Sequence, residues 1–324
     1  MRVLVTGAGG FVGRHLLAYL QQQPDISLYG TIAGEDQRES LIGLCPHLTV
    51  LDLRDSRLVR DLLEECQPDQ IFHLAGQAFV PRSFEDPWET IDNNVHGTLN
   101  LLQAILTLKL STRMLVVGSA EVYGAVQPDQ IPLTEDAPFA PSSPYSVSKI
   151  AQDMLALQYT LAHRLFTVRV RPFNHIGPGQ NRRFSVSNWA LQIAEAEVGL
   201  RTPILHVGNL TAARDFTDVR DVVRAYAEVL THGDSGGVYN VCSGKAYSMQ
   251  SIMDTLLSLS KIPIDVQIAT DRLRPVEIPI LVGDYGRLHA CTGWQPQIPL
   301  EQSLRDVLDE WRQYVTAQLT NSTP

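Results

Sequence analysis

The sequence predicts an α/β protein with a doubly wound parallel β-sheet and a smaller α/β substrate-binding domain at its C-terminal end. In the first half of the chain, short runs rich in β-branched residues alternate with helical stretches, and this rhythm loosens after about residue 175. Such alternation is typical of a parallel sheet that helices cover on both faces. The chain has 324 residues, enough for one large core or two modest ones.

The expected elements follow from the spacing of apolar residues. We expect strands over 2–6, 26–31, 48–52, 70–74, 113–118, 165–171 and 237–241. We expect helices over 11–23, 56–66, 86–109, 144–164, 185–199, 248–260 and 300–318. The predicted dinucleotide-binding domain comprises residues 1–173 with about 215–242, and the predicted substrate domain comprises 174–214 and 243–324.

Composition narrows the class of protein. No apolar run approaches the roughly 20 residues that a membrane span needs, and no secretory signal opens the chain, so we expect a soluble cytoplasmic protein without a membrane partner. The formal net charge of −9 argues against nucleic acid as a partner. The four cysteines and nine histidines form no metal-ligand motif, so no metal site is expected.

A glycine-rich turn follows the first predicted strand. Gly7, Gly10 and Gly13 are spaced three residues apart, close to the dinucleotide-binding fingerprint of Rossmann domains. The helix that begins there offers free N–H groups to phosphates. We therefore expect Gly7, Gly10, Phe11, Val12 and Gly13 to bind a dinucleotide; the alternative is a merely structural turn.

The end of the second predicted strand bears on the choice of cofactor. NAD sites usually place a carboxylate there to bind the ribose 2′-hydroxyl, whereas this chain has Gly30, Thr31 and Ile32. Arg38 could pair with a 2′-phosphate, although a solvated loop arginine is an equal alternative. The sequence favours NADP(H) over NAD(H), with Thr31 near the cofactor.

A catalytic set is predicted around the start of helix 144–164. Tyr145 and Lys149 are four residues apart and lie on one face of that helix. A neighbouring ammonium favours the phenolate, so the pair can work as an acid and base. Ser119 follows the fifth strand, at the sheet edge where such folds bind ligands, and can hold a carbonyl oxygen.

These motifs together resemble the extended short-chain dehydrogenase/reductases. The matching segments of the first half are the glycine turn and residues 52–53, 74–76, 94–98, 118–124 and 145–149. The second half resembles the branch of that family acting on GDP-sugars, through residues 171–179, 214–219, 239–241, 274–277 and 293–296. The resemblance implies cofactor contacts from Asp52, Leu53, Leu74, Ala75, Gly76, Asn94, Tyr145 and Lys149. It implies that the sugar nucleotide is bound by Asn174, Arg183, Arg214, Arg274 and Glu277.

Two reactions occur in that branch, and the sequence favours one. Reduction of the C4 keto group of GDP-4-keto-6-deoxy-D-mannose, giving GDP-D-rhamnose, needs only Ser119, Tyr145, Lys149 and a hydride. The 4,6-dehydration of GDP-mannose also needs a base, which Glu121 matches, and a further proton donor, which Ala120 cannot be. A 4-epimerase and a non-catalytic dinucleotide sensor remain as alternatives.

The same sequence predicts a homodimer. The helices over 92–109 and 144–164 carry more apolar positions than one core-facing stripe requires. They are Val95, Leu99, Leu101, Leu102, Ile105 and Leu106 in the first helix and Met154, Leu155, Leu157, Tyr159 and Leu161 in the second. Two such helices from each subunit can form a four-helix contact about a twofold axis, an arrangement that the family resemblance also implies. The alternative is that these faces pack on the sheet of their own subunit.

Overall fold

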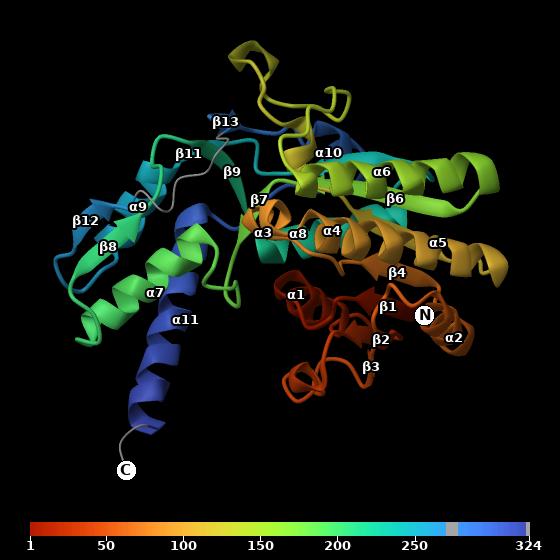
Figure 1. The fold of residues 1–324 in the computed structure, drawn as a ribbon, viewed down its shortest axis with the longest axis horizontal. Coiled ribbons are helices and arrows are strands. Elements are labelled where there is room, and N and C mark those ends of the chain that lie inside the picture. The colour runs from red at the N-terminus through yellow and green to blue at the C-terminus, as the bar shows by residue number, and fades with distance from the viewer. Residues whose placement is uncertain (270–277, 322–324) are drawn as a thin grey trace.

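The computed structural model describes residues 1–269 and 278–321. Its central sheet has seven parallel strands in the order β10-β6-β5-β4-β1-β2-β3 (Figure 1). In chain order they are β1 (Arg2–Thr6), β2 (Ser27–Ile32), β3 (His47–Val50), β4 (Gln70–His73), β5 (Arg113–Val117), β6 (Phe166–Pro172) and β10 (Val238–Val241). The predicted doubly wound sheet is confirmed. Its strand order reverses between β1 and β4, and ligands of such sheets bind at the carboxyl ends beside that point.

Helices cover both faces of this sheet. One face carries α1 (Phe11–Leu20), α8 (Val219–His232) and α10 (Gly286–Thr292), and the other carries α2 (Ser56–Cys66), α5 (Gly97–Thr107) and α6 (Pro144–His163). Successive side chains of a strand point to opposite faces. Thus Val3 and Val5 pack with α1 and α8, whereas Leu4 between them packs with α2 and α5.

The predicted helical region over 86–109 is confirmed in its extent, but it contains a π-helical turn and is preceded by a separate short helix. The chain forms α3 (Val80–Glu85), α4 (Pro87–Ile91), a π-helical turn η2 (Asp92–His96) and then α5. Asp86 ends α3, and its carboxylate caps the next helix by accepting from the N–H of Glu89, while Pro87 occupies the first turn of α4. The π-turn is a wide turn of the kind that often marks functional sites.

Part of the apolar surface that α5 and α6 carry belongs to the core of their own subunit. Leu101, Leu102, Ile105 and Tyr159 are buried within the subunit, in the cluster that packs under β1 and β4. Leu161, in contrast, is 75% exposed. One face of each helix therefore packs on the sheet, and the outer face of α6 is exposed in the single subunit.

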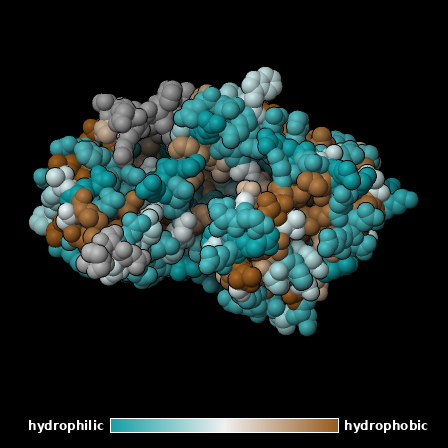
Figure 2. Space-filling view, turned by 60° about the horizontal axis from the view of Figure 1, so that its bottom comes forward, coloured by the Kyte–Doolittle hydropathy of each residue, from teal (hydrophilic) through white to brown (hydrophobic). Residues whose placement is uncertain are grey.

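The second lobe contains the three helices predicted over 185–199, 248–260 and 300–318, together with short strands that the sequence pattern did not predict. It contains β7 (Asn174–Ile176), β8 (Ile204–Val207), β9 (Ala213–Asp218), β11 (Ala246–Ser248), β12 (Asp265–Ile268), β13 (Ile280–Leu281), α7 (Ser185–Glu197), α9 (Met249–Ser258) and α11 (Leu300–Asn321). Strands β7, β11 and β13 each pair with β9, and α7, α9 and α11 share one hydrophobic core. Figure 2 shows the surface hollowed between this lobe and the Rossmann domain. None of the helices in the described residues is long and apolar enough to cross a membrane.

Candidate active site

The glycine turn between β1 and α1 is packed too closely for side chains. Gly7 has a φ of +69°, and a Cβ on it would lie 2.9 Å from the backbone of Ala75. A Cβ on Gly13 would lie 2.4 Å from the carbonyl oxygen of Gly7. The Gly7 N–H donates to the hydroxyl of Thr31 on β2 at 3.2 Å. Helix α1 then begins after Gly10 without a side-chain cap, so its first N–H groups are free for an anion.

The end of β2 carries no carboxylate, but one lies a few residues beyond it. Glu35 lies in the 3₁₀ turn η1 (Glu35–Gln37) and accepts two N–H bonds from the Arg38 guanidinium. That hydrogen-bonded pair holds the pKa of Glu35 below its usual value. A third Arg38 N–H donates to the backbone oxygen of Leu48 at 2.9 Å. Arg38 is therefore oriented on this loop rather than freely solvated.

The predicted residues after β3 and β4 border the same edge of the sheet. Asp52 is exposed and paired with Arg54 at 2.6 Å, whereas Leu53 is buried. Leu74 and Ala75 are half-buried directly after β4. Gly76 follows them with a φ of +156°, and a Cβ there would lie 2.6 Å from Oδ1 of Asn94.

Asn94 joins three segments of the site from the π-turn η2. Its Oδ1 accepts from the N–H of Gln77 at 2.7 Å, and its Nδ2 donates to Oγ of Ser148 on α6 at 2.8 Å. The side chain is fully buried. The π-turn directs this amide toward α6, so Asn94 fixes the helix that carries the catalytic pair.

The predicted catalytic residues lie close together in the structure. Ser143 caps α6 in a capping box with Ser146, so the helix starts immediately before Tyr145. Lys149 Nζ lies 5.9 Å from the centre of the Tyr145 ring, and the Ser119 hydroxyl is near enough to act on the pKa of the Tyr145 phenol. All three residues are buried.

Burial sets the protonation of this group. It raises the pKa of Tyr145 to about 12, with the Ser119 hydroxyl opposing the rise and the charge of Glu121 adding to it. The lowering of this pKa expected from the neighbouring Lys149 ammonium is therefore wrong, because burial outweighs it. Burial lowers the pKa of Lys149 to about 8. Tyr145 is therefore a protonated phenol at neutral pH, able to donate to an oxygen that gains negative charge.

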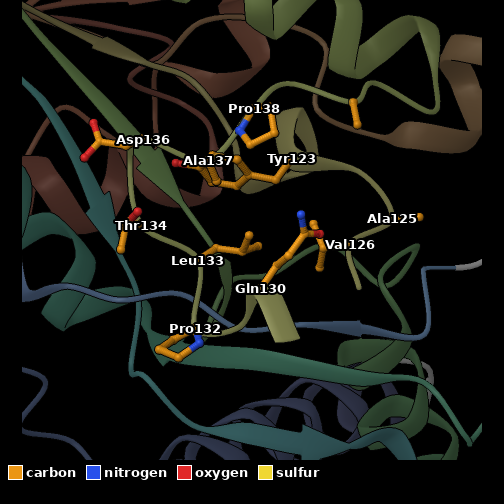
Figure 3. Close-up of a pocket in the computed structure, with 11 residues that line it drawn as sticks. Tyr123, Ala125, Val126, Gln130, Pro132, Leu133, Thr134, Asp136, Ala137 and Pro138 are labelled. Carbon is orange, nitrogen blue, oxygen red and sulfur yellow. The ribbon is translucent and has the colours of Figure 1, made fainter. Parts of the chain in front are cut away.

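A buried ionic network supports the segment between Ser119 and Tyr145. Asp153 on α6 binds both Arg169 at 2.6 Å and Arg171 at 2.8 Å, and Arg171 also donates to the Tyr123 hydroxyl at 3.0 Å. Tyr123 belongs to the 3₁₀ turn η3 (Ala120–Tyr123) that follows Ser119. A cavity of 540 Å³ lies on the other side of Tyr123, formed by the segment through the 3₁₀ turn η4 (Pro128–Gln130) (Figure 3). None of the predicted catalytic residues lines it.

The predicted substrate residues lie in the second lobe, with differing exposure. Asn174 on β7 and Arg183 are exposed, and the Arg183 guanidinium lies 5.4 Å from the centre of the Phe79 ring. Arg214 on β9 is buried, and its Nη1 donates to the backbone oxygen of Ala213. Arg274 and Glu277 lie outside the described residues.

The second lobe contacts the glycine-turn helix directly. Phe11, the first residue of α1, stacks on His175 of β7 with 6.1 Å between ring centres and 9° between planes. His15 of α1 is bonded to the backbone oxygen of Pro178 at 2.7 Å. The two lobes therefore meet where the dinucleotide phosphates are expected.

The comparisons with known proteins agree with this geometry. The family model described as GDP-mannose 4,6 dehydratase matches residues 4–307. The chain belongs to this family. It is thereby an NAD(P)-dependent oxidoreductase of the extended short-chain dehydrogenase/reductase type, and the resemblance inferred from the motifs is confirmed.

Individual members of the family show which activities occur among its relatives. GDP-6-deoxy-D-mannose reductase of Pseudomonas aeruginosa is 39% identical over 97% of this chain and 98% of its own. GDP-mannose 4,6 dehydratase 2 of Arabidopsis thaliana is 29% identical over 95% of this chain and 86% of its own. The structure of RMD from Pseudomonas aeruginosa complexed with NADPH is 38% identical, with a TM-score of 0.86, covering 97% of this chain and 99% of that one. The UDP-glucose 4-epimerase of Thermus thermophilus in complex with NAD is 28% identical, with a TM-score of 0.84, covering 96% and 99%.

The sequence did not predict the polar side chains that hydrogen bonds link to Lys149, the predicted catalytic lysine. Lys149 Nζ donates to Oε1 of Gln152, which in turn contacts Thr98, and Thr98 contacts His73. Gln152 follows Lys149 by three positions on α6, a spacing that places both on one helix face. That spacing could have identified Gln152, but nothing local connects it with Thr98 or His73.

Proposed function

We propose that this protein reduces the C4 keto group of GDP-4-keto-6-deoxy-D-mannose with NAD(P)H, giving GDP-D-rhamnose. The observation that carries the proposal is a site with one polar proton donor, Tyr145, next to Ser119. Ala120, where a dehydratase needs a second donor, is an apolar side chain that is 2% exposed. The 39% identity to a GDP-6-deoxy-D-mannose reductase over nearly the whole of both chains supports the same reaction.

The residues of the site fit a dinucleotide, and each has a separate role in the reduction. The close-packed glycines and the uncapped start of α1 form a cradle for a pyrophosphate. When bound, the reduced nicotinamide supplies the hydride. Ser119 holds the carbonyl oxygen, Tyr145 donates its proton to that oxygen, and the Lys149 ammonium stabilises the phenolate that remains.

One observation favours a second function, the 4,6-dehydration of GDP-mannose. Glu121 is half-buried and close enough to raise the pKa of Tyr145, so a carboxylate base is available at the site. Reduction does not need that base. The neighbouring Ala120 makes dehydration the weaker candidate, because the departing C6 hydroxyl would lack its proton donor.

Two parallel incubations test the proposal. The protein is mixed with GDP-4-keto-6-deoxy-D-mannose and NADPH, and separately with GDP-mannose and NADP, and the sugar products are identified by mass spectrometry and NMR. We expect NADPH consumption and GDP-D-rhamnose in the first mixture only. Formation of the keto sugar in the second would establish the dehydratase instead, and dinucleotide binding without turnover in either would indicate a sensor.

We propose NADP(H) rather than NAD(H) as the preferred cofactor. The end of β2 lacks a carboxylate, and Arg38 is held by Glu35 and Leu48 on the loop that follows this strand. A 2′-phosphate at this edge would bind the guanidinium in place of Glu35. Arg38→Ala should lower kcat/KM for NADPH about 10-fold or more relative to NADH. Arg57→Ala, an exposed arginine of α2, is the matched control and should leave the ratio unchanged.

We also propose where the sugar nucleotide binds. The Rossmann domain would bind the dinucleotide, and the second lobe would bind the GDP-sugar through Asn174, Arg183, Arg214, Arg274 and Glu277. The predicted Rossmann bounds (1–173 with about 215–242) change at two places, because β9 joins the sheet of the second lobe and α10 packs on the Rossmann sheet. The hollow between the lobes and the stacking of Phe11 on His175 support a shared cleft (Figure 2). Guanidinium groups suit a diphosphate because they bind its oxygens bidentately.

We propose a homodimer through the outer faces of α5 and α6. Val147 and Leu161, two heptads apart on α6, are 48% and 75% exposed, so an apolar stripe faces away from the sheet. Leu161→Glu should shift the mass by light scattering from a dimer to one chain of 35.9 kDa. Leu200→Glu, at an apolar side chain 57% exposed on the second lobe, is the control. A wild-type mass of one chain would refute the dimer.

The cytoplasm is the proposed location. The four cysteines are unpaired thiols, and three of them are buried. Burial raises the pKa of Cys45 to about 11 and that of Cys66 to about 12, so both remain unreactive thiols. A fold whose thiols are buried and unpaired suits a reducing compartment.

A further inference from the structure

The Lys149 ammonium has two hydrogen-bond acceptors among the described residues. Its Nζ donates to the backbone oxygen of Val117 at 2.9 Å and to Oε1 of Gln152 at 2.8 Å. An ammonium carries three N–H groups, so one remains beyond these bonds. Gln152 is 1% exposed and lies on the same face of α6 as Lys149.

The Gln152 amide is held in one orientation by Thr98. Its Nε2 donates to the Thr98 hydroxyl at 2.6 Å, and that hydroxyl gives its single proton to the backbone oxygen of Asn94 at 2.8 Å. If the amide were turned over, its NH₂ would face the Lys149 ammonium, donor against donor. The carbonyl oxygen of Gln152 therefore faces the lysine.

His73 is the second side chain that donates to the Thr98 hydroxyl. The Nε2 of His73 lies 2.9 Å from the Thr98 hydroxyl. Because that hydroxyl donates its proton to the backbone oxygen of Asn94, it accepts from His73, and Nε2 carries the ring proton. Its Nδ1 then accepts from the hydroxyl of Thr6 at 2.8 Å. Burial, and secondarily the Lys149 charge, lowers the pKa of His73 to about 3, which keeps the ring neutral. Hydrogen bonds from two sides therefore converge on the Thr98 hydroxyl, from Thr6 through His73 and from Lys149 through Gln152.

Few charges compete with Gln152 for this ammonium. The titratable groups that face it are His73 on β4 and Tyr145 on its own helix, and Glu121 on η3 acts on Tyr145. Asp153 is committed to its two arginines. Burial lowers the pKa of Lys149 to about 8, so the gain or loss of one hydrogen-bond acceptor changes the charged fraction of Lys149 near neutral pH.

We propose that Gln152 is a positioning residue of the active site, whose amide oxygen holds the Lys149 ammonium and leaves one N–H for the Tyr145 and cofactor side. The inference rests on the proposed reduction, in which the ammonium stabilises the phenolate. It adds to that function a group that touches neither substrate nor cofactor. Thr98 and His73 act behind Gln152 by fixing its amide.

Direct titration of Lys149 tests the proposal without turnover. Lys109, Lys149, Lys245 and Lys261 are the only lysines in the sequence, so the ε-carbon signals of ¹³C-lysine can be assigned by NMR with a Lys149→Met variant. Gln152→Leu removes the acceptor and should lower the midpoint for Lys149 by about one pH unit. Gln152→Glu keeps an acceptor and adds a charge, and should raise the midpoint by about one unit or more.

The pH profile of kcat/KM for keto-sugar reduction should follow the titration. Its alkaline limb should move to lower pH in Gln152→Leu and to higher pH in Gln152→Glu. Gln192→Leu is the matched control, because Gln192 is also a buried helical glutamine but bonds Asn188 and His206 in the second lobe. It should leave the Lys149 midpoint unchanged.

The outcomes separate this inference from the proposed function. A Lys149 midpoint that is the same in wild type, Gln152→Leu and Gln152→Glu would overturn the role of Gln152, whatever the reaction. If Gln152→Leu fails to fold, Gln152→Glu decides alone, and a midpoint at or below that of wild type contradicts the proposal. Failure to reduce the keto sugar would refute the reaction but leave the titration result standing.

Discussion

The two walls of the proposed active site differ in how their side chains are held. On the catalytic wall, Tyr145, Lys149 and Asn94 are buried, and the hydrogen bonds of Asn94 and Lys149 join different elements. On the nucleotide-sugar wall, Asn174 and Arg183 are exposed side chains at the edge of a small second lobe. The side chains of the first wall are buried, whereas Asn174 and Arg183 of the second are open to solvent and only Arg214 is buried there.

This difference has a physical reason. Proton transfer needs donors fixed within a few tenths of an ångström and a dry environment that shifts pKa values, which burial supplies. A GDP-sugar must enter and leave, so its ligands have to lie on an accessible surface. Mutations on the catalytic wall should therefore change rate or stability, and those on the other wall should change substrate affinity.

The strongest test of the catalytic wall is Tyr145→Phe. Loss of the proton donor should lower kcat by about 10²–10⁴-fold while NADPH still binds. Tyr123→Phe is the control, since Tyr123 is also a buried phenol but bonds Asn240 and Arg171 outside the reacting group. Equal kcat for wild type and Tyr145→Phe would remove Tyr145 from the reaction.

The network behind the catalytic wall should carry much of its stability. Asp153→Leu leaves Arg169 and Arg171 buried without their carboxylate, which should cost about 3–5 kcal/mol in the free energy of unfolding. Urea denaturation measures the loss. Asp61→Ala, which breaks an exposed 3.8 Å pair with Arg57, should cost less than about 1 kcal/mol. Similar losses in the two variants would contradict the contrast between buried and open regions.

The open wall should respond in substrate affinity alone. Arg183→Ala should raise the KM for the GDP-sugar about 10–100-fold, because a charge-assisted bond to a diphosphate contributes roughly 1.5–3 kcal/mol. The KM for NADPH should not change. Arg182→Ala, the exposed neighbour of Arg183, controls for a general loss of positive charge. If both variants behave alike, the effect is one of net charge and Arg183 has no specific contact.

The last prediction concerns acid stability. The pKa of His73 is about 3 in the folded protein against a usual value of 6.5, so the unfolded chain binds a proton first as the pH falls. Stability from this group is complete above pH 6.5 and is lost on acidification, by about 1.4 kcal/mol per pH unit until pH 3 is reached. Denaturation at several pH values should show this slope, weaker in His73→Asn than in the exposed control His96→Asn.

Much of the site was predictable because its constraints are local. The positive φ of Gly7 and the close approach of a Gly13 Cβ to the Gly7 carbonyl oxygen are constraints within seven consecutive residues, whereas the contact of Gly7 with Ala75 is not local. The capped start of α6 and the four-residue spacing fix Tyr145 and Lys149 on one helix face. The alternation of strands and helices likewise gave the parallel sheet, because each apolar run has its own period.

The tertiary structure decided what depends on contacts between distant segments. His73, Thr98 and Gln152 are bonded across 25 and 54 residues of chain, and no local pattern links them. The π-turn that aims Asn94 at α6 reads as ordinary helix in the sequence. Burial, which places Tyr145 near a pKa of 12 and Lys149 near 8, exists only once the sheet and helices pack together. The sequence by itself therefore determined which groups can react, and packing determined their protonation and their partners.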